Sequence, residues 1–329
     1  MTVQDSAILP ASIAVGPTGT ATKTATANPV SGVVTTTVAG RPRRTVGGTA
    51  LAAIGVASFS LSFPATVWLL QGFGPWTGMG LRGVVAALCA GACLLAARVP
   101  LPARAHLPGL VVVAVGCVVG FPLLTTLALQ TSSAGHSAVV IGLLPLATTI
   151  VSVVRTGERP SRSFWAAALA GAAVVLAFSL QQSGGGPGTA DAYLFAALLV
   201  CAAGYAEGGR LARHMPGWHV IAWALVGSLP ITITTTALAM NTEPMHPDAR
   251  SVAALFYIAV VSQFAGFVVW YRGMAAIGVT AASQLQLAQP LLTLLWAALI
   301  LHESMTPAMP LAAFAVLACI AVTQRAKRT

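Results

Sequence analysis

The chain has 329 residues, of which 57% are hydrophobic and only 7% charged, with a net charge of +10 and a mean hydropathy of +0.84. About a quarter of the residues in a soluble domain are charged, so this composition excludes an ordinary soluble protein. Since roughly 20 apolar residues in a helix span a bilayer core, the sequence predicts an all-α polytopic membrane protein. Five long stretches contain no Asp, Glu, Lys or Arg: 48–70, 107–131, 163–190, 251–271 and 304–324.

The N-terminal segment differs from the rest of the chain. Residues 1–45 are rich in Thr, Ala, Val, Gly and Ser, show no sustained periodicity, and end in the basic cluster Arg41–Arg44. A secretory signal has a charged start that leads into an apolar run with a cleavage site, and this segment does not show that pattern. We therefore expect a disordered cytoplasmic tail.

Ten transmembrane helices account for the remainder. Short connections rich in Gly, Pro and polar residues separate them, as is typical of turns. With both termini inside, most Lys and Arg fall on the cytoplasmic side. Arg250 and Arg82 are the exceptions, and the opposite side collects Asp191, Glu243, Asp248 and Glu303. The expected spans are 48–70, 77–97, 107–128, 134–154, 163–181, 191–210, 217–238, 251–271, 278–301 and 307–324.

This orientation predicts a multi-pass protein of the plasma membrane with both termini cytoplasmic and the lipid bilayer as its surroundings. The net charge of +10 then reflects topology, and no nucleic-acid partner is expected.

Two stretches share an unusual pattern. LPLATTIVSVVRTGE (144–158) and QPLLTLLWAALILHE (289–303) each have Pro second, Leu third, Thr three residues after the Pro and Glu thirteen after it. The offset between them is 145 residues throughout. Each is the fourth helix of a group of five, so the second group enters the membrane from the opposite side. The sequence thus predicts two inverted-topology five-helix repeats, 46–182 and 191–325.

In these features the chain resembles the ten-helix drug/metabolite transporters, whose halves are called EamA domains. The fourth helix of each of their repeats carries a mid-helix proline, and the turn after it bears a glutamate, here Pro145 with Glu158 and Pro290 with Glu303. The resemblance covers residues 46–325 and implies an exporter of small metabolites, such as amino acids, or of drugs. Inverted repeats are the architecture of alternating-access transporters, with the solute site near the midplane between the repeats.

Residues expected along a solute pathway lie on the fourth, eighth and ninth helices. A proline inside a helix leaves a carbonyl without its amide partner, which in hydrocarbon needs a cavity or another partner. Polar residues of the ninth helix share one face, and their alternative role is hydrogen bonding between helices. For the aromatic residues of the eighth helix, the alternative is a belt at the membrane interface. The pathway candidates are Pro145, Gln263, Trp270, Ser283, Gln286, Gln289, Pro290 and Thr293.

Three ionisable residues are candidates for coupling or ion pairing. Glu207 is the carboxylate expected inside a span, where ionisable groups are costly and usually functional. Arg210 lies three residues on, on the same helix face, so a local ion pair is favoured over proton coupling or solute contact. His136 opens the fourth helix and belongs to the residue type that titrates near neutral pH. It could carry a proton or simply be satisfied by water.

Glu158 and Glu303 are interpreted as turn residues that brace the fourth and fifth helices of each repeat. The five cysteines of the chain fall inside expected spans, without a CxxC pair or a Cys–His cluster at metal-ligand spacing. We therefore expect no catalytic residue, no metal site and no cofactor.

The leading hypothesis is a secondary transporter that exports a small solute by alternating access. The sequence has no GxxxxGK[ST] phosphate-binding loop, so the chain itself does not hydrolyse ATP. A membrane channel or a non-transporting membrane scaffold is the alternative. An intramembrane enzyme is disfavoured because the sequence has neither GxSxG nor HExxH. The small-molecule solute is the expected partner, and the sequence allows a homodimer.

Overall fold

The computed structural model describes residues 46–156, 161–182, 188–277 and 285–326, and these ranges are helical and contain no strand. The first half comprises α1 (Val46–Ser60), α2 (Ser62–Leu69), α3 (Pro75–Ala96), η1 (Arg104–His106), α4 (Leu107–Val113), η2 (Ala114–Gly120), α5 (Phe121–Ala128), α6 (Ala134–Ile141), α7 (Leu144–Thr156) and α8 (Arg162–Gln182). The second half comprises α9 (Thr189–Leu211), α10 (Gly217–Gly227), α11 (Leu229–Ala239), α12 (Ala249–Phe256), η3 (Tyr257–Ala265), α13 (Gly266–Ile277), α15 (Gln289–Ile300) and α16 (Ala308–Ala326).

Several of these helices join end to end into stretches long and apolar enough to cross a bilayer. Within the described residues there are five such stretches, and α10 with α11, bent by 43°, would make a sixth. Shorter apolar helices occupy parts of the other expected spans. The five stretches are Val46–Leu69, Pro75–Ala96, Arg104–Ala128, Thr189–Leu211 and Ala249–Gly273.

Both halves interrupt the helix expected as their fourth span just before the proline. A two-residue turn at 142–143 separates α6 from α7, and a matching turn at 287–288 precedes α15. Because α7 starts at Leu144 and α15 at Gln289, each proline occupies the second position of a new helix, where a missing amide hydrogen costs little. The proline helices of the sequence pattern are therefore broken helices rather than continuous kinked ones.

A second paired feature lies in the third and eighth of the expected spans, where η2 and η3 are π-helical. Adding the repeat offset of 145 residues to 114–120 gives 259–265, which falls within η3 at Tyr257–Ala265. Single π-turns are rare and often mark functional sites. The internal repeat is thus visible in the backbone as well as in the sequence.

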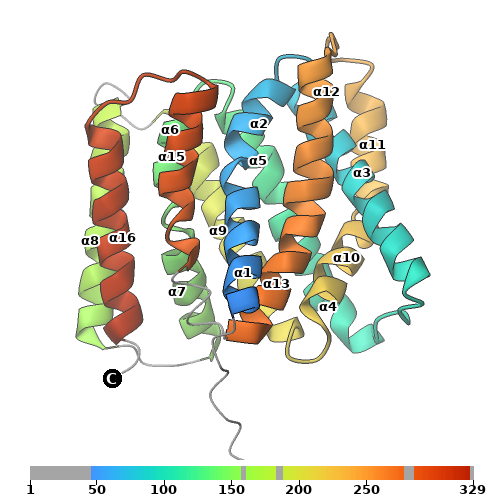
Figure 1. Ribbon diagram of the computed structural model, residues 1–329, viewed down its shortest axis with the longest axis horizontal. Coiled ribbons are helices and arrows are strands. Elements are labelled where there is room, and N and C mark those ends of the chain that lie inside the picture. The colour runs from blue at the N-terminus through green and yellow to red at the C-terminus, as the bar shows by residue number, and fades with distance from the viewer. Residues whose placement is uncertain (1–45, 157–160, 183–187, 278–284, 327–329) are drawn as a thin grey trace, which may run out of the picture. The chain divides into compact units, whose positions relative to one another are not determined.

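The helices do not group by sequence half. α9 of the second half packs along α4, η2, α5, α6 and α7 of the first, and we name this group the α9 bundle. α1 and α2 of the first half pack along α12, η3, α13 and α15 of the second, and we name this group the α1 bundle. Outside the two bundles, α3 packs against α10 and α11, and α8 lies beside α16 (Figure 1). Each bundle therefore contains helices from both halves of the sequence.

Carboxylates fix the starts of two helices at the end of the protein where the sequence collects acidic residues. At the start of α3, Glu243 accepts hydrogen bonds from the backbone N–H groups of Trp76 (3.1 Å) and Thr77 (2.8 Å). At the start of α12, Asp248 accepts from the backbone N–H of Ser251 at 2.8 Å, and the hydrogen bonds from Ser251 hold the pKa of Asp248 below its usual value. Anionic caps of this kind satisfy the unpaired amides of a helix N-terminus.

Candidate functional site

A cavity of about 70 Å³, which we name the central cavity, lies between the α1 bundle and the α9 bundle. Both bundles contribute aromatic and polar side chains, and α3 contributes an arginine. Lining residues that bear on the chemistry are Phe59, Arg82, Cys117, Tyr205, Gln263 and Phe267.

Arg82 is the charged residue of the central cavity. It lies within the span Pro75–Ala96 and is only 7% exposed. Its Nε donates a hydrogen bond to Oε1 of Gln263 at 2.6 Å, and among the described residues no carboxylate forms an ion pair with it. A guanidinium keeps its charge in proteins, so the cavity is positively charged here. The sequence placed Arg82 on the outer face as an exception to the charge rule, and the structure instead buries it.

Gln263 holds Arg82 in place and joins the two π-helical segments. Its side chain extends from η3, is 3% exposed, and uses both ends of its amide. Oε1 accepts from Arg82, and Nε2 donates to the backbone carbonyl of Val118 in η2 at 3.2 Å. Gln263 and Val118 are 145 residues apart, so equivalent positions of the two repeats meet here. The pathway candidate Gln263 therefore lies at the cavity, where it orients the arginine.

Aromatic rings form an apolar wall of the central cavity. The ring centroids of Phe59 and Phe267 lie 4.9 Å apart, and those of Tyr205 and Phe267 lie 6.3 Å apart. Trp270, a pathway candidate, does not line this space: it is 8% exposed and packs edge-on behind Phe59 at 6.5 Å. Such a wall favours a solute with an apolar or aromatic body.

The two helix breaks line a second, smaller hollow of about 30 Å³. Pro145 lies on its α9-bundle side, and Gln286, Gln289 and Pro290 lie on its α1-bundle side. Gln289 lines both this hollow and the central cavity, so the two spaces adjoin. The structure thus brings these pathway candidates together. Ser283 lies outside the described residues.

Thr293 lines both the central cavity and the adjoining hollow, but its hydroxyl donates a hydrogen bond to the protein backbone. Its Oγ1 donates to the backbone carbonyl of Ser60 at 2.9 Å, and the indole of Trp296 donates to Oγ of Ser60 at 2.9 Å. These bonds join α15 to α1 within the α1 bundle. For Thr293 the geometry matches the alternative of hydrogen bonding between helices.

Glu207 and Arg210 form a local ion pair near the end of α9. Oε1 of Glu207 accepts from Nε of Arg210 at 2.9 Å and from Nη2 at 2.6 Å. The Glu207 side chain is 2% exposed and the Arg210 side chain 36% exposed, so the arginine reaches toward the surface while the carboxylate stays buried. Neither residue lines the central cavity or the adjoining hollow.

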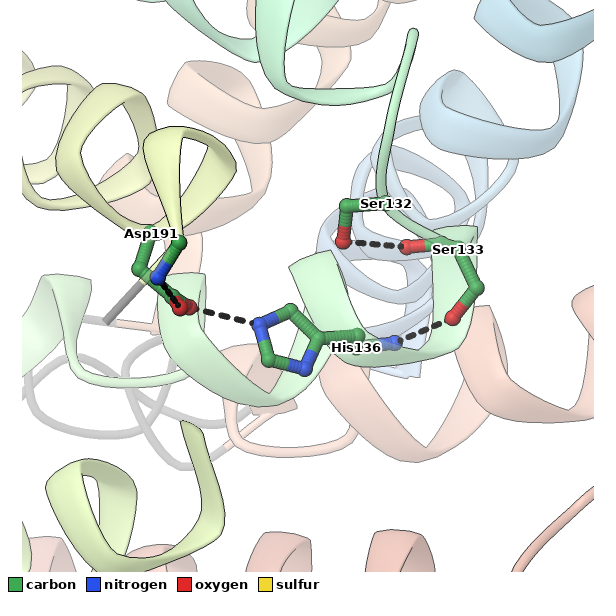
Figure 2. A network of polar contacts seen from close by, with 5 residues as sticks. Ser132, Ser133, His136 and Asp191 are labelled. Atoms are coloured by element: carbon green, nitrogen blue, oxygen red, sulfur yellow. Dashed lines mark hydrogen bonds and ion pairs between the residues drawn. The ribbon is translucent and has the colours of Figure 1, made fainter. Parts of the chain in front are cut away.

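A second buried polar cluster lies at the N-terminus of α6 (Figure 2). Nε2 of His136 lies 2.7 Å from Oδ1 of Asp191, and the two residues are 7% and 1% exposed. Ser133 accepts from the backbone N–H of His136 at 3.0 Å, and Asp191 also accepts from the backbone N–H of Gly188 at 3.0 Å. His136 is thus satisfied by a carboxylate 55 residues away, rather than by water, because α9 packs beside α6.

Glu303 connects the two bundles at the same end. Its Oε1 accepts from the backbone N–H of Ala134 at 2.8 Å and its Oε2 from that of Gly135 at 3.0 Å. The carboxylate follows α15 and caps α6, so this brace runs from the second repeat to the fourth helix of the first. The sequence interpretation placed the brace within each repeat. Glu158 lies outside the described residues.

Comparison with known proteins decides the family. The EamA-like transporter family matches residues 46–180 and again residues 188–324. The chain belongs to this family. "Uncharacterized transporter YdeK" of Bacillus subtilis (strain 168) is 46% identical over 275 residues, which cover 83% of this chain and 95% of that relative. A solved crystal structure, 21% identical, shares the fold with a TM-score of 0.60 and covers 85% of this chain and 98% of its own. The resemblance to the drug/metabolite transporters is confirmed, and the protein is a membrane transporter of this family.

The residue that sequence reasoning missed is Arg82. Within the expected span 77–97 it is the sole charged residue, and an ionisable group inside a span is by default a candidate for function. That signal was available, but the positive-inside count treated Arg82 as part of a flank.

Proposed function

We propose that this protein is a secondary transporter that exports a small organic solute by alternating access. In this mechanism the α1 bundle and the α9 bundle separate at one membrane face and then at the other, with the solute held in the central cavity. A channel would need a continuous open path instead of a space enclosed between two bundles.

The observation that carries the proposal is the pairing of structural features around the cavity. Each family match contributes one helix break and one π-helical segment, related by the offset of 145 residues. Non-helical backbone at membrane depth is tolerated where it lines a cavity or is buried in protein. Paired inverted repeats with broken helices at a central site are the architecture of alternating access.

The proposed topology has ten spans in two inverted repeats, with both termini on the cytoplasmic side of the plasma membrane. It is supported by the distribution of charge, because four carboxylates cap helices at the end opposite to most basic residues: Asp191, Glu243, Asp248 and Glu303. In this orientation Glu303 and the His136–Asp191 pair lie at the extracytoplasmic end. The conformation described here is then closed at that end, where Ala134 of α6 and Ala297 of α15 belong to one buried cluster.

Replacement of Gln286 by alanine tests whether the hollow between the helix breaks belongs to the pathway. We expect solute flux into reconstituted vesicles to fall by about 2- to 10-fold, the effect of losing one hydrogen bond to the solute, while the amount of inserted protein stays the same. Gln181→Ala, on the exposed surface of α8, is the matched control. Wild-type flux from correctly inserted Gln286→Ala would remove this residue from the pathway. Flux that neither saturates nor responds to competitors would indicate a channel.

A further inference from the structure

We infer that the transported solute carries a carboxylate on an apolar body, and that Arg82 is the residue that binds this carboxylate. The inference rests on the proposed transport function and narrows it to one chemical class of solute. It is carried by three features of the central cavity: an unbalanced positive charge, the geometry in which that charge is held, and the character of the remaining walls.

The positive charge of Arg82 has no counter-charge among the described residues. The ion pairs formed there are those of His136 with Asp191 and of Arg210 with Glu207. A buried charge without a partner is strongly destabilising, and inside a membrane protein such a group is retained where it serves a function. An anion that enters the cavity supplies the missing partner.

The guanidinium is held so that its outer edge stays available. Gln263 accepts from Nε at 2.6 Å and is itself fixed by its bond to Val118. Among the described residues, the terminal nitrogens of Arg82 form no hydrogen bond with the protein, while the residue lines the central cavity. A guanidinium presents its N–H groups as a planar fork that matches the two oxygens of a carboxylate. The geometry therefore suits one planar anionic group.

The other walls distinguish a simple carboxylate from an amino acid. The described residues that line the central cavity and the adjoining hollow include no Asp or Glu, so the ammonium group of a zwitterion finds no anionic partner. Phe59, Tyr205 and Phe267 offer an aromatic surface to the rest of the solute. The cavity thus favours a monoanion with an aromatic or aliphatic body over a zwitterion or a neutral amide.

Three probes with the same aromatic skeleton test this preference: hydrocinnamate, hydrocinnamamide and phenylalanine. Binding to the purified full-length protein is measured by calorimetry at neutral pH. We expect hydrocinnamate to bind about 10-fold or more tightly than either of the other two, as for a hydrogen-bonded charge pair that the amide cannot form. Equal affinity for the three probes, or no binding of hydrocinnamate, would overturn the inference.

Two substitutions remove the preference by different routes. Arg82→Gln deletes the charge, and Gln263→Glu places a protein carboxylate beside Arg82 with little change of shape. In both variants we expect the ratio of hydrocinnamate to hydrocinnamamide affinity to fall to about 1, whereas Arg82→Lys keeps part of it. Arg104→Gln, at the exposed start of η1, is the control that keeps the wild-type ratio. Because Gln263→Glu retains Arg82, it tests the inference even if Arg82→Gln fails to fold. An unchanged ratio of hydrocinnamate to hydrocinnamamide affinity in folded Gln263→Glu contradicts the inference.

Flux measurements separate this inference from the proposed transport function. Saturable flux of hydrocinnamamide or phenylalanine without preference for hydrocinnamate would support the proposed transport function and overturn the carboxylate assignment. Arg82-dependent binding of hydrocinnamate without any flux would support the carboxylate assignment and overturn the proposed transport function.

Discussion

Replacing Asp191 by alanine is expected to lower the free energy of unfolding by about 2–5 kcal/mol. Asp191 is 1% exposed and contacts both the imidazole of His136 and the backbone N–H of Gly188. Its loss leaves the buried imidazole of His136 without a hydrogen-bond partner, which costs about 1–3 kcal/mol. It also removes a helix cap, which contributes about 0.5–2 kcal/mol. The effect is measured as the shift in thermal unfolding of the purified protein.

Asp248→Ala is the matched control for this experiment. Asp248 also caps a helix at the same end of the protein, but it lies on the exposed surface, so its removal should cost less. Asp191→Asn keeps an oxygen acceptor for His136 and should retain part of the stability. If Asp191→Ala unfolded at the same temperature as Asp248→Ala, the buried pair would contribute nothing to stability.

Replacing Glu303 by alanine is expected to open the end of the protein where α6 meets α15. The Glu303 carboxylate accepts two backbone hydrogen bonds from the N-terminus of α6, and bonds to charged groups contribute about 1.5–3 kcal/mol each. These bonds join the two bundles in the closed conformation, so their loss shifts the population toward the open one by about 10-fold or more. A single cysteine introduced at Gln289, in protein without its native cysteines, reports the change through its rate of reaction with an impermeant maleimide added outside.

Glu243→Ala separates opening from simple loss of a cap. Glu243 also accepts from two backbone amides at a helix start, but it caps α3, which packs beside its own helix α11 and does not connect the two bundles. We expect Glu243→Ala to destabilise the protein without raising the labelling rate at Gln289. Equal labelling of the Glu303 and Glu243 variants would show that Glu303 does not hold this end closed.

The breaks at Pro145 and Pro290 show what can be predicted from the sequence and why. Proline acts on its own backbone, and the repeat offset of 145 residues is a property of the chain, so the family and the special character of these helices could be inferred. The packing of helices from one half against helices of the other could not be inferred from the sequence. In a bilayer every face of a helix can be apolar, and small or polar residues set its neighbours, so the pattern of α1 does not indicate that its partner is α13.

The same limit decides what could be predicted at individual residues. Gln286 could be proposed because helical spacing puts it on one face with Pro290 and Thr293, and Gln289 because it lies beside that face. For His136 both a proton-carrying role and contact with water were left open, and its partner Asp191 could not be inferred because the two residues belong to different repeats. Arg82 was missed because its charge was used to fix orientation, although it stands alone in an apolar span.

Locking α6 to α15 tests most directly whether the two bundles move apart around the central cavity. Ala134→Cys combined with Ala297→Cys places two thiols in one buried cluster, where oxidation or a short bis-thiol reagent can join them in protein without its native cysteines. We predict that cross-linking reduces flux of any solute carried by the wild type to background, that reduction of the disulfide restores it, and that each single cysteine variant transports throughout. Undiminished flux through the cross-linked protein would contradict alternating access by separation of these bundles.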